Sequence, residues 1–222
     1  NAYRAPDGSN GLNGYNVDFD RTWGTGYVLG AAFEKPEIGM RVALTYFSKV
    51  SHDMDTQETI GGVPVAAPSV TTIDTPQAVN LDLQSGVAKD TLVFGSIRWV
   101  DWSEFKIEPA FFNGATGRGL VALEDSTTYT LGVGRKFNDN WSGSVFVTYE
   151  PGGNPNVSPL APTNGYKGIG LAAVYTRDNM KITMGARYLD LGNAMASPGG
   201  VPVAAMQDNH AVALGLKVGF TF

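Results

Sequence analysis

The sequence has no cysteine among its 222 residues. This absence excludes disulfide bonds, zinc–thiolate sites and a cysteine nucleophile. Charged residues are also scarce, at 17% of the chain, whereas ordinary soluble domains contain roughly 25%. The charges sum to −5, and nucleic acids are bound by basic surfaces, so we predict no nucleic-acid partner.

Long apolar runs are absent as well, and no segment contains the ~18 consecutive apolar residues of a membrane-spanning helix. Disorder is excluded, because 43% of the residues are hydrophobic and 11% are aromatic. Glycine is in excess, with 28 residues. The composition therefore indicates a folded chain that is neither an ordinary soluble domain nor a helical membrane protein.

Signatures of catalysis and of metal binding are also missing. The sequence contains no G-x-S-x-G, H-E-x-x-H or P-loop motif, and its only histidines are His52 and His210. Residues 52–55 (His-Asp-Met-Asp) lack the fixed ligand spacing of a cation site, so we interpret them as solvated loop. A lipase would need a serine–histidine pair, and the sequence does not establish that Ser48 and His210 are adjacent. We predict that the protein is not an enzyme and carries neither a cofactor nor a metal.

Apolar and polar residues alternate with a period of two along much of the chain, which is typical of strands with two different faces. In the last segment, for example, Leu214, Leu216 and Val218 alternate with small or polar residues. The nine predicted strands are residues 22–34, 38–48, 77–86, 90–102, 126–137, 141–150, 165–176, 180–189 and 211–222.

The connections between these strands alternate in length. Short turns are predicted at 35–37, 88–89, 138–140 and 177–179, and long connections at 51–76, 104–122, 151–164 and 191–208. This pattern is typical of a transmembrane antiparallel β-barrel, which has short periplasmic turns and long extracellular loops. A soluble β-sandwich is the alternative, but a sandwich has no reason to keep its short turns at one end. Counting back from the last strand, residues 1–21 are predicted to be an extracellular loop.

Aromatic and charged residues fit the same interpretation. The charged residues Arg41, Lys181 and Lys217 fall on the small and polar face, which would line the lumen. On the apolar faces the exceptions are Lys167, Arg135 and Asp101, which lie near strand ends, where a charge costs least. The apolar faces end in aromatic residues, as an interfacial girdle would: Phe33, Tyr46, Phe137, Trp141, Tyr149, Tyr175 and Tyr188.

Nine strands do not close a barrel of the usual bacterial kind, which has an even number of strands. An open sheet is not viable in lipid, because each unsatisfied backbone group costs several kcal/mol there. We therefore expect either further strands that precede this chain or a tenth strand within residues 12–20.

Several short motifs resemble the FadL family of outer-membrane transport proteins, in order along residues 20–222. They are Trp-Val-Asp-Trp-Ser-Glu-Phe at 99–105, Pro-Gln-Ala-Val-Asn-Leu at 76–81, Leu-Glu-Asp-Ser at 123–126, Phe-Asn-Asp-Asn-Trp-Ser at 137–142 and Gly-Phe-Thr-Phe at 219–222. Members of this family form a fourteen-stranded barrel that is plugged by an N-terminal hatch. The resemblance implies that residues 22–222 supply the last nine strands, without the hatch and the early strands.

The resemblance also implies a location and a function. We expect a barrel in the outer membrane of a Gram-negative cell, monomeric and in contact with lipid and lipopolysaccharide. We expect it to be a channel for passive uptake of long-chain fatty acids or similar hydrophobic compounds. The alternative is a barrel that serves as a surface adhesin or receptor without transport, and a general porin is a third option.

Candidate lumen residues are apolar or basic side chains on the otherwise small and polar face. Arg98 and Arg187 are predicted either to bind a substrate carboxylate or to form ion pairs with Glu150 or Asp82. The apolar members are predicted either to line a fatty-chain pocket or to pack against the hatch: Phe47, Phe94, Val100, Phe146 and Leu189.

The long connections contain a seven-residue repeat, Gly-Gly-Val-Pro-Val-Ala-Ala, at residues 61–67 and 199–205. Apolar residues in an exposed loop are unfavourable unless they pack together or meet a ligand. One interpretation is a hydrophobic groove that captures substrate, and the other is two hairpin tips that pack on each other over the barrel mouth. The predicted ligand-binding residues of the repeat are Val63, Val65, Val201 and Val203.

Overall fold

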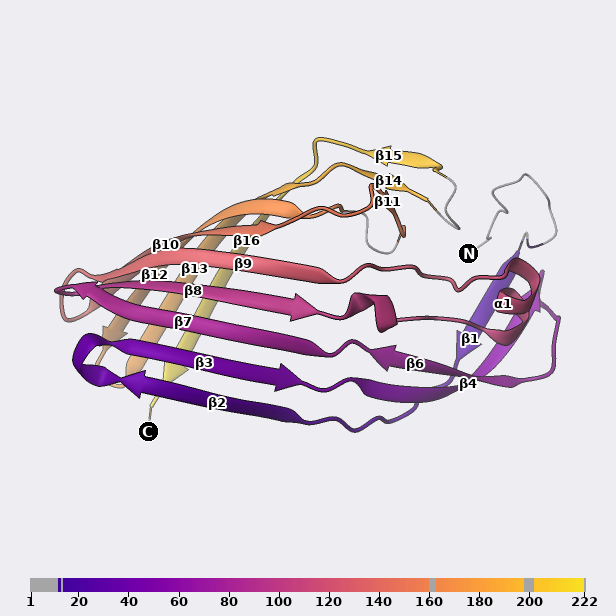
Figure 1. Ribbon diagram of the computed structural model, residues 1–222, viewed down its shortest axis with the longest axis horizontal. Coiled ribbons are helices and arrows are strands. Elements are labelled where there is room, and N and C mark those ends of the chain that lie inside the picture. Colours follow the sequence, from indigo (N-terminus) through magenta and orange to yellow (C-terminus); the bar gives the residue numbers. More distant parts are fainter. Residues whose placement is uncertain (1–11, 13, 160–162, 198–201, 222) are drawn as a thin grey trace.

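The computed structural model describes residue 12 and residues 14–159, 163–197 and 202–221. One antiparallel sheet has the strand order β16-β13-β12-β10-β9-β8-β7-β3-β2, so that β2 and β16 are its edges within the described residues. In Figure 1 the strands β2, β3, β7, β8 and β9 run side by side, whereas β12, β13 and β16 recede behind them at a steep angle, so the sheet is curled. The strands are β2 (Val28–Lys35), β3 (Met40–Phe47), β7 (Ala78–Ala88), β8 (Thr91–Val100), β9 (Ser126–Lys136), β10 (Trp141–Glu150), β12 (Tyr166–Arg177), β13 (Met180–Leu191) and β16 (His210–Phe220).

All nine predicted strands are present in this sheet, with one clear shift of a boundary. Strand β2 begins at Val28, six residues later than predicted. The segment before β2 packs closely against the chain around Val50, where a methyl group on Gly24 would lie 2.5 Å from Val50 Cγ1. The Ser48 N–H donates to Tyr27 O at 3.0 Å, and the Tyr27 N–H donates to Ser48 Oγ at 2.8 Å. The close approach of these two segments explains why glycines interrupt the strand pattern there.

The tight turns predicted from the sequence all connect strands of the large sheet at one end. The 3₁₀ helix η1 (Pro36–Ile38) joins β2 to β3. Asp90 (φ 58°) and Asp178 (φ 51°) sit in the turns after β7 and β12, and aspartate tolerates this left-handed region. Between β9 and β10, Asn138 Oδ1 accepts a hydrogen bond from the Trp141 N–H at 2.9 Å. Local turn chemistry therefore fixes this end of the sheet.

The two faces of the large sheet differ, as the alternation predicted. On the outer face, Val147 of β10 lies opposite Leu131 of β9 and Ile169 of β12. These three side chains are 52%, 59% and 50% exposed. A continuous apolar surface of this kind is unfavourable in water. The outer face is therefore the one suited to hydrocarbon.

The long connection predicted at residues 51–76 is folded into a sheet, so residues 52–55 belong to a strand and not to the solvated loop predicted for them. It contains β4 (Val50–Ile60), β5 (Val63–Pro64) and β6 (Ser69–Thr75), and β1 (Tyr15–Phe19) pairs with β4 at the other edge. Gly61 (φ 60°) and Gly62 (φ 83°) form the tight turn between β4 and β5. The alternative of a tenth strand of the barrel sheet within residues 12–20 is wrong, because β1 belongs to this smaller sheet.

The remaining long connections also contain short elements. The connection after β8 holds the 3₁₀ helix η2 (Trp102–Glu104) and the helix α1 (Ala110–Thr116). A three-stranded sheet joins β11 (Asn156–Val157), β14 (Ala194–Ala196) and β15 (Ala204–Met206). Among the described residues, no helix is both long and apolar enough to cross a membrane.

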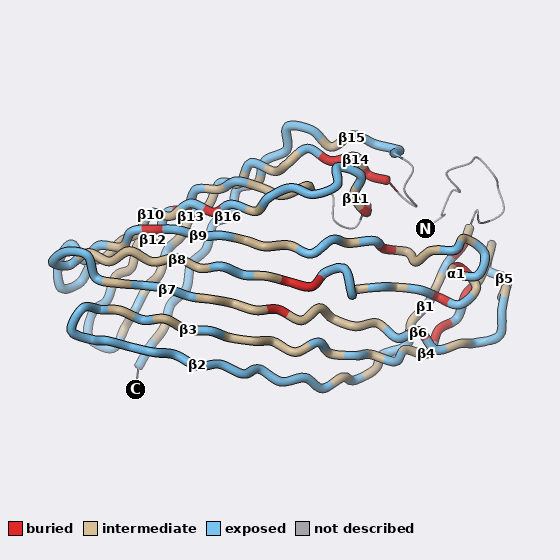
Figure 2. The backbone as a smooth tube through the Cα atoms, viewed as in Figure 1, coloured by how far each residue is buried: buried red, intermediate tan, exposed pale blue. Residues whose placement is uncertain are grey.

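Few residues are buried, and most of them lie toward the end with the long connections (Figure 2). Tyr15 and Phe112 pack there, with ring centroids 5.1 Å apart. Within the large sheet, Gly132, Thr148 and Gly170 are buried. All three are on the inner face close to Phe146, so this face is locally covered there.

A single glycine controls the junction between β13 and the long connection that follows it. The Gly192 N–H donates to Gly165 O at 2.9 Å, and a methyl group on Gly192 would overlap the carbonyl oxygen of Asn164. We expect Gly192→Ala to lower the free energy of unfolding by about 1–3 kcal/mol, because the overlap is with backbone. Gly215→Ala is the control, since a methyl group there meets nothing within 4 Å. Urea unfolding of both variants in lipid vesicles checks this, and equal stability would contradict it.

Candidate functional site

Three of the predicted site residues lie in one row across the inner face of the large sheet. The register pairs Phe94 of β8 with Gly132 of β9, and Gly132 with Phe146 of β10. It then pairs Phe146 with Gly170 of β12, and Gly170 with Arg187 of β13. Paired residues in antiparallel strands point to the same side of a sheet. The row therefore has two aromatic rings and one arginine, separated by glycines.

The glycines let the aromatic rings of this row lie against the backbone. The rings of Phe94 and Phe146 have their centroids 6.5 Å apart, with an angle of 55° between their planes. A methyl group on Gly132 would overlap the ring of Phe94, and one on Gly170 would overlap the ring of Phe146. The two rings thus form an apolar platform on an otherwise small and polar face. We call Phe94 and Phe146 the aromatic platform.

Arg187 lies at the end of the row without a carboxylate beside it. Its guanidinium carbon is 5.6 Å from the ring centroid of Tyr166, and its Nε is buried without a hydrogen-bond partner in the described part of the chain. The predicted ion pair of Arg187 with Glu150 or Asp82 is wrong for the residues that the structure describes. Glu150 instead accepts a hydrogen bond from Thr128 Oγ1 at 2.6 Å.

Arg98 is held by neighbours on its own face. Its Nη1 donates to Asn80 Oδ1 at 2.7 Å, and its guanidinium carbon lies 5.6 Å from the ring centroid of Phe47. An ion pair of Arg98 with Asp82 or Glu150 is likewise not found among the described side chains, so that prediction is wrong here too. Asn80, which lies directly opposite Arg98 in the register, is the hydrogen-bond partner where a carboxylate was predicted.

Val100 and Leu189 lie on the same inner face as the platform. Val100 is 6% exposed and shares a row with Phe47, since both pair with Ala78. Leu189 covers Gly168, where a methyl group would lie 2.6 Å from Leu189 Cδ2. The register thus places the five apolar candidates on one face of the sheet: Phe47, Phe94, Val100, Phe146 and Leu189.

The repeat residues are not brought to this face. Val63 belongs to β5 and is 64% exposed, and Val65 donates its N–H to Glu58 O at 3.1 Å. Val203 precedes β15, is 60% exposed and donates its N–H to Ala196 O at 2.9 Å. Val201 lies outside the described residues. The described parts of the two copies therefore belong to different small sheets.

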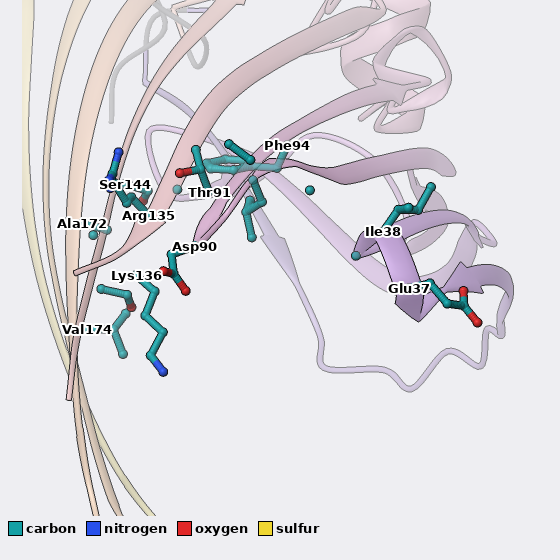
Figure 3. Close-up of a pocket in the computed structure, with 17 residues that line it drawn as sticks. Glu37, Ile38, Asp90, Thr91, Phe94, Arg135, Lys136, Ser144, Ala172 and Val174 are labelled. Carbon is teal, nitrogen blue, oxygen red and sulfur yellow. The ribbon is translucent and has the colours of Figure 1, made fainter. Parts of the chain in front are cut away.

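A cavity of about 750 Å³ on the short-turn side of Phe94 was not predicted from the sequence. Figure 3 shows Phe94 between Ile38 on one side and Ser144, Ala172 and Val174 on the other. Small inward residues such as Gly134, Ser142 and Ser144 leave this space open. Glycine, serine and alanine at successive inward positions are the feature of the sequence that could have indicated this cavity. Alternation by itself indicates only that the face is small and polar.

A second cavity, which we call the mouth cavity, lies where the connection after β8 meets the connection after β10. Its volume is about 870 Å³. Apolar side chains that line it include Trp102, Phe105, Val121 and Leu123. This cavity was not predicted from the sequence either. Its walls come mainly from two long connections, and the alternation of apolar and polar residues predicts only strands.

A third, smaller cavity of about 460 Å³ lies beside Tyr46 and Lys49. Lys49 Nζ is 2.8 Å from Asp74 Oδ2, and this hydrogen bond lowers the pKa of Asp74 and raises that of Lys49. Asp101, interpreted above as a charge near the lipid, is only 8% exposed and accepts a hydrogen bond from Gln77 Nε2 at 2.8 Å. Asp101 is therefore held by a hydrogen bond within the protein, with little exposed surface.

Solved structures of outer-membrane channels share this fold with the chain. The CymD monoaromatic hydrocarbon channel is 15% identical, with a TM-score of 0.58 over 94% of this chain and 56% of that one. A Pseudomonas aeruginosa FadL homologue is 14% identical, with a TM-score of 0.60 over 87% and 49%. The Ralstonia pickettii toluene transporter TbuX is 14% identical, with a TM-score of 0.55 over 95% and 52%. The chain spans about half the length of these structures.

No curated protein sequence matches the chain. The family described as "Outer membrane protein transport protein (OMPP1/FadL/TodX)" matches residues 5–222. This match confirms the resemblance carried by the motif at residues 99–105 and the predicted outer-membrane location, and the shared fold confirms the antiparallel barrel architecture. The chain therefore belongs to the OMPP1/FadL/TodX family of outer-membrane transport proteins.

Proposed function

We propose that the chain is the site-bearing part of a channel for passive uptake of long-chain fatty acids or similar hydrophobic compounds across the outer membrane. The row formed by the aromatic platform and Arg187 is the observation that carries this proposal. An apolar platform inside a polar lumen suits an apolar chain, and an arginine without a carboxylate partner suits an acidic head group.

The length of the row supports a long cargo. Four steps between neighbouring strands of about 4.8 Å separate β8 from β13, so Phe94 and Arg187 lie about 19 Å apart along the sheet. A fatty acid lying across the strands would place its carboxylate at Arg187 and its chain over Phe146 and Phe94. The binding path therefore runs across the strands and not only along them.

The energetics assign different roles to the two ends of the row. Each methylene group removed from water contributes about 0.8 kcal/mol, whereas a hydrogen bond to a charged group contributes about 1.5–3 kcal/mol. A chain that covers the platform with several methylenes therefore supplies most of the affinity. Arg187 contributes orientation and selection for an acid.

Two structures that share the fold of this chain support a hydrophobic cargo as a class. CymD is described as a monoaromatic hydrocarbon channel and TbuX as a toluene transporter. Neutral aromatic compounds are thus the alternative cargo for the same platform. Contact with lipopolysaccharide, a monomeric state, and the division into a loop at 1–21 and nine strands at 22–222 stay predictions.

Uptake of radiolabelled palmitate tests the proposed function, in cells that lack their own fatty-acid channel and produce the full protein. We expect uptake above background and about tenfold slower uptake at limiting palmitate in the double variant Phe94→Ala/Phe146→Ala, since loss of about 1.4 kcal/mol is a tenfold effect. Phe33→Ala is the matched control, because this exposed phenylalanine lies on the outer face of β2. Uptake equal to background in cells with correctly inserted protein would overturn the proposal.

A further inference from the structure

The inner face of β12, β13 and β16 carries basic side chains and no carboxylate in the residues that the structure describes. Its cations are Arg187, Lys181 and Lys217, and none of them forms an ion pair with a described residue. At the other edge of the sheet, by contrast, Arg41 is paired with Glu34 at 3.2 Å. A barrel wall that carries charge of one sign concentrates ions of the opposite sign. This part of the sheet therefore attracts anions.

The two lysines lie close together near the short-turn end of the sheet. Lys217 of β16 is opposite Thr183 of β13, and Lys181 is opposite Gly219. Lys181 and Lys217 are thus diagonal neighbours on one face, about 7–8 Å apart. Thr183 shares this face and neighbours both lysines. Two ammonium groups and a hydroxyl together offer a carboxylate several hydrogen-bond donors, two of them charged.

Small residues separate the lysines from Arg187 along the inner face. The row between them contains Ala172 of β12, Gly185 of β13 and Gly215 of β16. A methyl group on Gly215 would meet nothing within 4 Å, so no side chain stands in this space among the described residues. Arg187 and Thr183 are four residues apart on β13, which is about 14 Å along the strand. A carboxylate can therefore move from Arg187 to the lysines over nearly bare backbone.

An apolar cavity lies in the same rows as the lysines. The cavity of about 750 Å³ beside Phe94, which we call the short-turn cavity, is lined on one side by Ala172 and Val174 (Figure 3). Val174 pairs with Thr183, and Thr183 pairs with Lys217. Two steps of about 4.8 Å therefore separate the cavity wall from this lysine. Because a cavity of about 150 Å³ is enough to hold benzene, the short-turn cavity has room for an alkyl chain.

The charges of the cavity decide which end of a fatty acid enters it. The charged residues that line it are Glu37, Asp90, Arg135 and Lys136. The two carboxylates repel an acidic head group. Asp139 Oδ1 already holds the Lys136 ammonium at 2.8 Å, and Arg135 occupies an outer-face position of β9. The apolar chain is thus the end that enters the cavity, and the head group is left at Lys217.

We propose that Lys217, Lys181 and the short-turn cavity form a second binding site for a fatty acid, which receives the acid from Arg187 on its way toward the short turns. The inference rests on the proposed function, because such a site serves uptake only where an acid first enters the lumen. It goes beyond that function by giving the acid a direction. Arginine presents a rigid fork of donors, whereas lysine is a single charge on a flexible stem. Arg187 therefore orients the head group, and the lysines pass it on.

Crystals of the full protein soaked with 2-bromopalmitate test the second site, because the bromine lies next to the carboxylate and marks it by anomalous scattering. We expect one bromine beside Arg187 and another beside Lys217. The double variant Lys181→Gln/Lys217→Gln should lose the second bromine and keep the first. Bromine beside Arg187 alone in the wild-type protein would overturn the second site and leave the proposed function standing. Bromine beside Lys217 without palmitate uptake supports the second site, and only the proposed function then fails.

Chemical labelling in lipid nanodiscs tests the same site in a bilayer, with the N-hydroxysuccinimide ester of palmitate as the probe. The lysine amine attacks the ester carbonyl, an amide bond forms and N-hydroxysuccinimide leaves. We expect free palmitate to lower palmitoylation of Lys217 about fivefold, because palmitate at roughly four times its Kd leaves one fifth of the site free. Lys35 is the matched control, since it is an exposed lysine on the outer face at the same end of the sheet. Equal suppression at Lys35, or none at Lys217, would overturn the site.

A carboxylate elsewhere in the full protein is the competing partner for the two lysines. Removing one member of a buried ion pair is strongly destabilising, whereas a substitution that stays solvated changes stability little. We therefore expect Lys181→Gln/Lys217→Gln to unfold at the same urea concentration as the control variant Lys35→Gln. A lower midpoint for the double variant would show that the lysines hold another part of the protein and would overturn the site.

Uptake kinetics test the passage of the acid. We expect Lys181→Gln/Lys217→Gln to lower the maximal rate of palmitate uptake about fivefold, as when a step after binding is slowed. Toluene uptake should stay unchanged, because toluene has no charge for the lysines to attract. Equal losses for both compounds, or an unchanged rate for palmitate, would overturn the role of the lysines in passage.

Discussion

Val147→Arg is expected to lower the free energy of unfolding in lipid vesicles by about 2–4 kcal/mol, which is the cost of an arginine on the lipid face near the bilayer midplane. Val147 lies in the middle of β10 on the outer face, between Leu131 and Ile169. No polar group of the neighbouring strands faces it in these pairs. Urea unfolding followed by tryptophan fluorescence measures the change.

The matched control is Ser144→Arg, three residues away on the same strand and on the inner face. An arginine there points into the cavity of about 750 Å³ and can reach water. We expect a change in stability near zero, since substitutions that stay solvated seldom cost more than about 0.5 kcal/mol. Equal losses for the two variants would contradict the assignment of the two faces.

Arg187→Ala is expected to weaken decanoate binding by roughly 10- to 100-fold, the loss that follows from removing a charged hydrogen bond of about 1.5–3 kcal/mol. Arg187 forms no ion pair with a carboxylate of the described residues, so its guanidinium is left to pair with the carboxylate of a bound acid. Toluene binding should stay unchanged, because toluene has no acidic group. Equilibrium binding to the purified protein in detergent measures both ligands.

Arg177→Ala is the control for this effect, since the Arg177 side chain is 68% exposed at the end of β12. It removes the same charge from the protein without altering the inner face. An unchanged affinity for decanoate in Arg187→Ala would contradict the role of Arg187. A parallel loss in both variants would indicate a general effect of net charge.

The nine strands of the barrel could be predicted because each one faces two different environments. Their apolar and polar residues must alternate, and the printed sequence shows this directly. Strand β4 could not be found in that way, because it places Thr56 and Glu58 in a small polar core and has no face for hydrocarbon. Its stability comes from partners such as Thr71, whose hydroxyl accepts a hydrogen bond from Thr56 Oγ1 at 2.8 Å.

The candidate site could also be predicted only in part. Alternation alone predicted that Phe94, Phe146 and Arg187 share a face, because their positions within each strand decide it. It did not predict that they share a row, since a row depends on the register between strands. The partner of Arg98 was missed for that reason: Asn80 and Asp82 lie two residues apart on the same face of β7, and only the register selects Asn80.

The bare backbone beneath the rings of Phe94 and Phe146 has a consequence for how this family could diversify. The floor of the lumen at this point is the peptide chain itself, at Gly132 and Gly170. A single codon change to alanine at Gly170 would push the ring of Phe146 toward the axis and narrow the passage. Bore width is thereby adjustable in steps of one methyl group, independently of the charge that Arg187 contributes.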